Sequence, residues 1–316
     1  MTCHNCEAKA KRHGKDRKGV QRYRCNTCQK TFTEYQEKPL DGMYLPLEKA
    51  VTILSMLLEG MSIRSVQRIT GVEKKTIVKL LVQAGEKSER LLNDKLKGLS
   101  VRDVQADELW GFVAMKNRTK HQNKVESEEL GTCYTWVAME THSKLVLAWH
   151  LGKRTSSDCV EFTEKLNEAT TGRFQLSTDA YPAYADAVCY SLGTRVDYAQ
   201  LTKIYESGKE TKVTAKRYSP TKFIKAIPTP IWGQPNMEKL CTSHIERLNL
   251  SLRMALRRLT RLTNAFSKKW YNLKCALALY FAYYNFVRTH QTLRCTPAMA
   301  HGITKSFWTL EDLLKY

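Results

Sequence analysis

The chain has 316 residues, a length that suggests two or three domains at roughly 100–200 residues each. Lys and Arg outnumber Asp and Glu by 51 to 31, and the net charge of +20 points to a polyanionic partner such as nucleic acid. Hydrophobic residues make up 42%, too many for a disordered chain, and a mean hydropathy of -0.45 argues against a membrane protein. Because the first residues include no apolar secretory signal, we expect a cytoplasmic protein.

Residues 1–40 hold two C-x-x-C pairs, Cys3 with Cys6 and Cys25 with Cys28. Each pair can lie on a tight turn that points both sulfurs inward, and four thiolates suit a tetrahedral zinc ion. The segment has too few apolar residues for a core, so a bound metal would hold it together. The alternative is four free or disulfide-bonded cysteines. We predict a zinc ribbon, whose basic residues contact phosphates.

Helical periodicity begins after this segment, and residues 44–97 are predicted to form a helix-turn-helix domain. Ser62 is expected to cap the first helix and Gly71 to permit the sharp turn. The residues expected on the buried side of the two helices are Ile63, Val66, Ile69, Ile77, Leu80 and Leu81. A further helix is expected around Leu91 and Leu92.

The second of these helices presents polar residues of the kind that meet bases and phosphates in a major groove. These candidate DNA-binding residues are Lys74, Lys75, Thr76 and Lys79. The alternative is an ordinary helical hairpin in a small bundle.

From residue 100 onward, the order of strands and helices predicts a mixed α/β sheet flanked by helices. Residues 104–115 have apolar side chains on both faces, as a central buried strand does. The other expected elements are a hairpin over 132–140 and 144–150, a helix over 156–169, a strand over 173–178, a helix over 182–192 and two helices after 237. Residues 200–236 are basic and poorly patterned, which favours an insertion, and 301–316 are expected to be a tail.

Three carboxylates stand in unusual places. Asp107 interrupts an otherwise apolar strand, Asp179 lies where a strand gives way to a helix, and Glu246 is the sole acidic residue from 240 to 300. If the fold brings them together, they can hold two Mg²⁺ or Mn²⁺ ions that act on a phosphodiester. Alternatively, Asp107 is a salt-bridged strand residue and Asp179 a helix cap. Glu108 is another possible ligand, although strand neighbours face opposite sides, so we expect it to point away.

Arg253 lies seven residues after Glu246, nearly two helical turns, so the two side chains share one helix face. A cation at this position can hold the phosphate on which the ions act. The alternative is a solvated arginine on a basic helix.

The segments DELWGFVAMK, STDAYPAY and SHIERLNLSLR, behind the cysteine pairs and the helix-turn-helix, resemble transposases of the insertion-sequence-one family. HIERLNLSLR followed by AFSKKWYNLK is the most specific match. The resemblance implies an RNase H-like DDE catalytic domain over residues 100–300, with Asp107, Asp179 and Glu246 as the acidic trio and Arg253 as the associated basic residue. Residues 200–236 depart from the pattern, since they look longer than in compact members.

The resemblance further implies a magnesium-dependent transposase that binds terminal inverted repeats, cleaves the ends of a mobile element and joins the 3′-hydroxyls to target DNA. A homodimer or higher oligomer is expected, because two ends are joined to one target, and the protein would associate with a prokaryotic nucleoid. The alternatives are a transposase-derived DNA-binding regulator without catalysis and another nuclease of the same fold, such as a resolvase.

Overall fold

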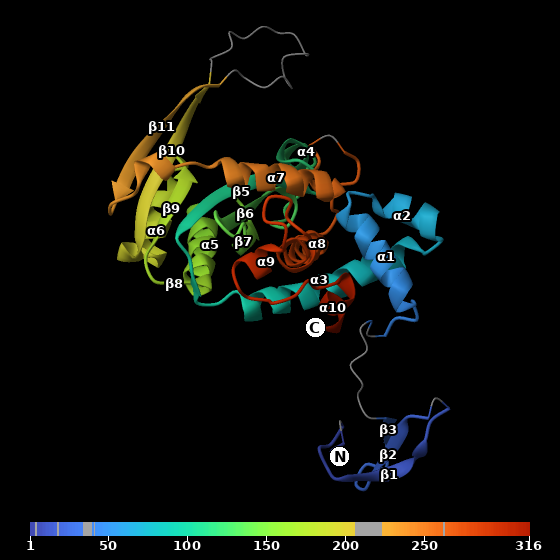
Figure 1. The fold of residues 1–316 in the computed structure, drawn as a ribbon. Coiled ribbons are helices and arrows are strands. Elements are labelled where there is room, and N and C mark those ends of the chain that lie inside the picture. The colour runs from blue at the N-terminus through green and yellow to red at the C-terminus, as the bar shows by residue number, and fades with distance from the viewer. Residues whose placement is uncertain (4, 18, 34–39, 41, 206–222, 262) are drawn as a thin grey trace.

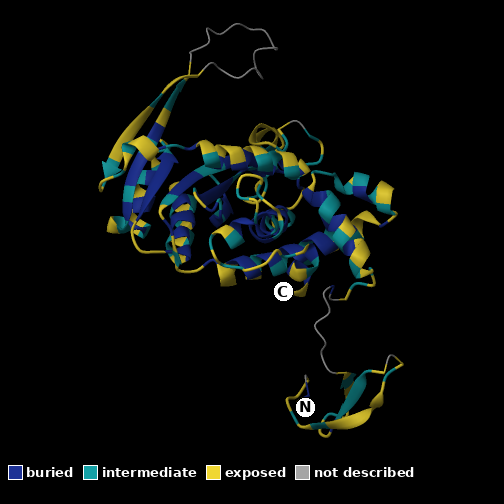
Figure 2. Cartoon of the chain, viewed as in Figure 1, coloured by how far each residue is buried: buried dark blue, intermediate teal, exposed yellow. Residues whose placement is uncertain are grey.

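The computed structural model describes the chain apart from residues 4, 18, 34–39, 41, 206–222 and 262 (Figure 1). Residues 1–33 form an antiparallel sheet of three strands, β1 (Ala10–Lys15), β2 (Gln21–Cys25) and β3 (Thr31–Thr33). Within the described part of this segment, Cys3 and Cys25 are the only buried residues, and Figure 2 shows its strands mostly exposed or half-buried. The interior of this small unit is therefore its cysteine cluster and not an apolar core.

The predicted helix-turn-helix consists of α1 (Leu47–Leu58), α2 (Ile63–Thr70) and α3 (Lys74–Lys95). The Ser62 hydroxyl caps α2 by accepting a hydrogen bond from the Ser65 amide, as predicted. Gly71 ends α2 in the left-handed conformation with φ of 69°, which glycine adopts without steric cost. The predicted cap and turn are confirmed.

Two expectations for this segment are wrong. Ile69 is 59% exposed, because it lies on the side of α2 that the other helices leave uncovered. Leu91 and Leu92 do not start a further helix, since α3 runs without a break for 22 residues. A Cβ on Gly85 of α3 would lie 2.4 Å from the Cys275 carbonyl oxygen, so α8 (Trp270–Ala282) packs directly against the α3 backbone.

The sheet has six strands in the order β11-β10-β9-β5-β6-β7. These are β5 (Asp103–Val113), β6 (Gly131–Glu140), β7 (Val146–Gly152), β9 (Phe174–Asp179), β10 (Val196–Tyr205) and β11 (Phe223–Trp232). The pairs β5–β6, β6–β7 and β10–β11 are antiparallel, whereas β5–β9 and β9–β10 are parallel. This mixed sheet flanked by helices is consistent with an RNase H-like fold.

Helices cover both faces of the sheet (Figure 1). On one face, the Trp136 ring of β6 lies 5.9 Å from Phe162 of α5 (Ser156–Ala169) and 5.5 Å from Tyr184 of α6 (Ala183–Ser191). On the other face, Trp149 of β7 lies 5.5 Å from Phe281 of α8. The helix α7 (Ser243–Ala255) packs on this second face, against β5. The central strand is thus covered on both sides, as its apolar pattern predicts.

Short elements connect this framework. They are β4 (Leu99–Ser100), α4 (Asn117–Gln122), β8 (Thr170–Thr171), η1 (Gly193–Arg195), η3 (Met237–Lys239), η4 (Arg257–Leu259), η5 (Tyr283–Val287), α9 (Pro297–Ala300) and α10 (Leu310–Lys315). Among the helices of the described ranges, none combines the length and the apolar composition needed to cross a bilayer.

No strand was expected over 200–236, but in the described parts residues of β10 and β11 pair in a long hairpin, and their assignment as an insertion stays a prediction. The intervening residues 206–222 lie outside the described part of the chain. Pro228 and Pro230 hide the strand pattern, yet both lie on β11, which is an edge strand. An edge strand tolerates proline because one side of its backbone has no partner strand.

The expected tail 301–316 also packs into the body. Leu310, Leu313 and Leu314 of α10 are buried, and the Tyr316 hydroxyl donates to Asp94 of α3 (2.7 Å). One continuous core cluster extends from Leu40 to Leu314. The predicted ranges 44–97 and 100–300 therefore share a core and are not independent units, because α3 extends into it.

Candidate functional site

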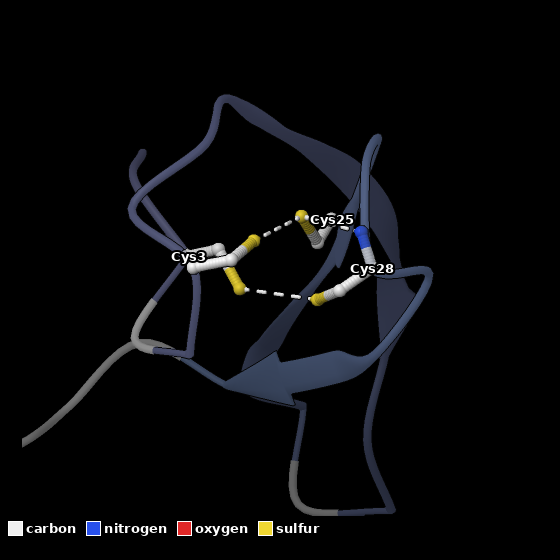
Figure 3. Close-up of side chains that lie close together, drawn as sticks. Cys3, Cys25 and Cys28 are labelled. Atoms are coloured by element: carbon white, nitrogen blue, oxygen red, sulfur yellow. Dashed lines mark hydrogen bonds between the residues drawn. The ribbon is translucent and has the colours of Figure 1, made fainter.

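The four ribbon cysteines form a compact group in which all four sulfurs lie within 4.8 Å of one another. Cys3 Sγ lies 3.6 Å from Cys28 Sγ, and Cys6 Sγ lies 3.4 Å from Cys25 Sγ (Figure 3). A tetrahedral zinc ion with Zn–S bonds of about 2.3 Å separates its sulfurs by about 3.8 Å, whereas a disulfide bond is about 2.05 Å long. The donor set fits a zinc site, as predicted from the spacing.

Backbone amides make two of these thiols more acidic. The Cys28 amide donates to Cys25 Sγ (3.4 Å) and is the main cause that lowers the Cys25 pKa, to about 6. The Asn5 amide does the same for Cys3 (3.4 Å) and lowers the pKa of that thiol. Because the thiolate is the metal-binding form, this backbone prepares the cluster for a cation.

A second group of ligand atoms lies where β5 runs past the end of β9. The parallel pairing of these strands stops at Gln105 and Ser177, and Asp107 and Asp179 follow each of them by two residues. One carboxylate oxygen from each of Asp107, Glu108 and Asp179 lies within 4.8 Å of the others. The fold therefore brings together two carboxylates that are 72 residues apart in the sequence.

Glu108 faces the opposite side of the sheet from Asp107, as strand alternation predicts, but one of its oxygens still joins the group of Asp107 and Asp179. The two side chains have packing partners on opposite faces of the sheet, since Asp107 accepts from Asn249 of α7 and Glu108 accepts from Tyr184 of α6. However, they lie beyond the paired part of β9, and the longer glutamate side chain reaches the same point at the strand edge.

Burial gives Asp107 an unusual acidity. Loss of solvation, followed by the neighbouring charges of Glu108 and Asp179, raises the Asp107 pKa from 3.8 to about 7. A divalent cation would reverse this shift, because it replaces the repulsion with attraction. The carboxylate donor set therefore fits Mg²⁺ or Mn²⁺, which prefer oxygen ligands.

Sequence reasoning missed the residues that hold Glu108. Its side chain is 3% exposed, with Arg154 Nη2 2.6 Å from Oε1 and the Tyr184 hydroxyl donating to Oε2 (3.2 Å). The Arg154 guanidinium also lies 4.2 Å from the centre of the Tyr181 ring and 3.9 Å from Asp179. Arg154 lies in a polar turn, where an arginine looks like an ordinary surface residue. Tyr181 and Tyr184 belong to the STDAYPAY segment, and this segment is the sequence feature that could have pointed to them as site residues.

Glu246 lies in the first turn of α7, the helix that packs on β5, but it is outside the group formed by Asp107, Glu108 and Asp179. Its Oε1 accepts from the Thr242 hydroxyl (2.7 Å) and pairs with Lys203 of β10. Its charge still contributes to the raised pKa of Asp107, after burial and the two nearer carboxylates. The predicted trio therefore meets in part: Asp107 and Asp179 come together, while Glu246 lies outside their group and is paired with Lys203.

Arg253 is engaged with backbone atoms. Its Nη1 donates to the Leu259 carbonyl oxygen (2.9 Å) and its Nη2 to that of Trp110 (3.1 Å). These contacts tie the end of α7 to β5. Its predicted contact with a phosphate stays a prediction.

The candidate DNA-binding residues are at the start of α3, where Lys74, Lys75 and Lys79 are exposed and Thr76 is half-buried. A cavity of about 950 Å³ lies between the first three helices and residues 256–279. Six cations line it, and its described lining residues include no carboxylate. These cations are Arg64, Lys74, Arg257, Arg258, Lys268 and Lys269.

No protein-family model matches the sequence, and no curated protein matches it. Among solved structures, the chain is similar to a chain of the simian T-cell lymphotropic virus intasome in complex with PP2A regulatory subunit B56 gamma, with 12% identity, a TM-score of 0.36 and coverage of 82% of this chain and 77% of that one. It is also similar to a chain of a pre-cleavage Mos1 transpososome, with 12% identity, a TM-score of 0.18 and coverage of 53% and 62%. The fold itself is defined by the order and direction of the six strands.

Proposed function

We propose that the protein is a DNA transposase that binds the ends of a mobile element, cleaves them and joins the freed 3′-hydroxyls to target DNA. The observation that carries the proposal is the meeting of Asp107 and Asp179 at one edge of an RNase H-like sheet, beneath the helix that bears Glu246. All three residues lie in the segments that resemble the insertion-sequence-one family.

Two divalent ions at this cluster would activate a water or a 3′-hydroxyl and stabilise the leaving oxygen of a phosphodiester. Asp107 and Asp179 are the proposed ligands, and Glu246 is the third once it leaves Lys203. Arg154 limits the repulsion between Glu108 and Asp179 and is the proposed anchor of this edge of the site.

Double-stranded DNA is the proposed partner. The exposed lysines at the start of α3 would contact its bases and phosphates. The cavity supports the same partner, because cationic side chains line it from two segments. One is the helix-turn-helix segment, and the other is residues 257–269. The four cysteines of the ribbon would hold one zinc ion, and a homodimer or larger oligomer would hold two ends together.

The test uses a duplex that carries the inverted repeats flanking the reading frame, with Mg²⁺ or Mn²⁺ added. We expect the wild-type protein to nick the duplex at the repeat and Asp179→Ala to bind the duplex without nicking it. The matched control is Asp186→Ala, an exposed aspartate on α6 that should leave nicking unchanged. Specific binding without metal-dependent nicking by the wild type would favour the non-catalytic regulator.

A further inference from the structure

Asn249 is a buried amide at the centre of the interface between α7 and β5. It is 7% exposed, and its Nδ2 donates to Asp107 Oδ2 (2.8 Å). Its Oδ1 is also buried but accepts no hydrogen bond from any described residue. The amide nitrogen of Asn249 is therefore bonded to a site carboxylate, while its amide oxygen receives no hydrogen bond from a described residue.

The buried position of Asn249 on α7 imposes a desolvation cost on its amide. Asn249 lies on the buried stripe of α7 with Ile245, Leu248 and Leu252, where an apolar side chain would pack without a desolvation cost. A buried carbonyl without a hydrogen bond costs about 1–3 kcal/mol. Asn249 lies three residues after Glu246 on the same helix, but Glu246 is exposed and pairs with Lys203 of β10. An acceptor kept at that cost beside the Asp107 carboxylate indicates a ligand.

We propose that Asn249 is a positioning residue of the ion site. Its Nδ2 fixes Oδ2 of Asp107, so that Oδ1, which also accepts the Glu108 backbone amide (2.9 Å), keeps a second lone pair for an ion. The Asn249 Oδ1 would accept a hydrogen bond from a water held in that site. This inference rests on the proposed function, because it places Asn249 in the same site. It goes further because it adds a neutral amide oxygen to a site whose other proposed groups are carboxylates.

A purely structural amide would behave differently. Such a residue would link α7 to β5, so its removal would lower the melting temperature of the protein but leave the affinity for a divalent ion unchanged. Partners that orient ligands typically change metal affinity by about 10–100-fold when removed. Metal affinity therefore separates the two roles, even for a variant that is less stable.

The test measures Mn²⁺ binding to the full-length protein by electron paramagnetic resonance after zinc loading. We expect Asn249→Leu, which keeps the branching of the side chain at Cγ but removes both polar atoms, to weaken Mn²⁺ binding at least about 10-fold. The control is Ser251→Ala, whose hydroxyl bonds within α7, and this variant should bind Mn²⁺ as the wild type does. Equal Mn²⁺ affinity of Asn249→Leu and the wild type would overturn the inference.

Asn249→Asp provides a second measurement that does not depend on the fold of the leucine variant. The added carboxylate repels Asp107 when no ion is present, and an ion relieves that repulsion. We expect Mn²⁺ to raise the melting temperature of Asn249→Asp by more than it raises that of the wild type, and an equal or smaller rise contradicts the inference.

The proposed function has its own readout in this experiment. If Asp179→Ala binds Mn²⁺ as tightly as the wild type, the carboxylate site and the inference both fail. If Asp179→Ala loses binding while Asn249→Leu retains it, only the inference about Asn249 fails.

Discussion

At the scale of single residues, the main feature of the site is Asp107, whose ionised form is disfavoured by burial and by its neighbours. Burial and the charges of Glu108 and Asp179 raise the Asp107 pKa from 3.8 to about 7. Between these values the folded chain holds a proton that the unfolded chain has released. Stability of the ion-free protein therefore falls as the pH rises through this window, and stays reduced above it.

This sign leads to a prediction for Asp107→Asn. In chelator-treated protein, the substitution should raise the free energy of unfolding above that of the wild type. This gain should be larger at pH 8 than at pH 5 by a few kcal/mol, at about 1.4 kcal/mol per unit of pKa shift. Urea unfolding at both pH values measures this difference. Asp186→Asn on exposed α6 is the control and should show no such pH-dependent gain. A gain that is larger at pH 5 would contradict the assignment of the buried proton.

The sequence makes some site residues predictable and hides others. Asp107 and Asp179 can be found because a carboxylate in or at the end of an apolar strand is an anomaly. Arg154 and Asn249 cannot, because an arginine in a polar turn and an asparagine in a helix have no unusual pattern until their partners are known. Alternation gives the correct face for Glu108, but it does not show that the longer side chain brings an oxygen to the group beyond the paired part of β9.

At the scale of elements, helical periodicity predicts the helices well, but strands depend on their place in the sheet. The predicted helix over 156–169 matches α5, whereas the hairpin of β10 and β11 was missed. Proline is a valid signal against a central strand, and only the strand order reveals that β11 is an edge. That order depends on pairing between distant segments, which local patterns do not contain.

The contact between α3 and α8 gives a prediction for Gly85→Ala. A Cβ there would meet the Cys275 backbone at 2.4 Å, so the two helices must move apart. We expect a loss of about 3 kcal/mol in the free energy of unfolding, at the upper end of typical overpacking costs. Lys87→Ala, two residues further on the same helix, should change stability by less than about 0.5 kcal/mol. Chemical denaturation of both variants checks this, and a neutral Gly85→Ala would show that the helices are less tightly packed.

The cysteine ribbon gives a second prediction at this scale. Cys25→Ser removes the thiol with the most strongly lowered pKa, so the protein should lose its zinc and the ribbon its fold. Metal analysis, together with limited proteolysis of residues 1–40, measures both effects. Cys189→Ser, which changes an exposed cysteine on α6, should retain one zinc per chain. A Cys25→Ser protein with full zinc content would contradict the four-thiolate site.

At the scale of the whole molecule, six cations line the cavity where the helix-turn-helix segment meets residues 256–279. Replacing Lys74 and Lys75 with Glu should weaken binding to element ends and lower the slope of log affinity against log salt by about 1.8, at about 0.9 for each phosphate that the protein no longer neutralises. Binding titrations at several salt concentrations measure this slope.

The control for that experiment makes the same change of charge elsewhere on α3. Arg90→Glu with Lys95→Glu lies about 24 Å or more along the helix from Lys74, at a rise of about 1.5 Å per residue. This pair should leave the salt slope close to the wild-type value. Equal slopes for the two double variants would indicate a diffuse effect of net charge.

The unbroken course of α3 has a consequence for the DNA itself. A rigid rod about 33 Å long joins the surface that would read sequence to the core that carries the carboxylates. If the proposed function holds, the recognition and cutting of DNA would keep a fixed rotational relation along the duplex. Inserting about five base pairs, half a turn of the duplex, between the bound repeat and the scissile bond should abolish nicking, and about ten should restore part of it. Nicking that tolerates every insertion equally would mean that the two activities are not mechanically coupled.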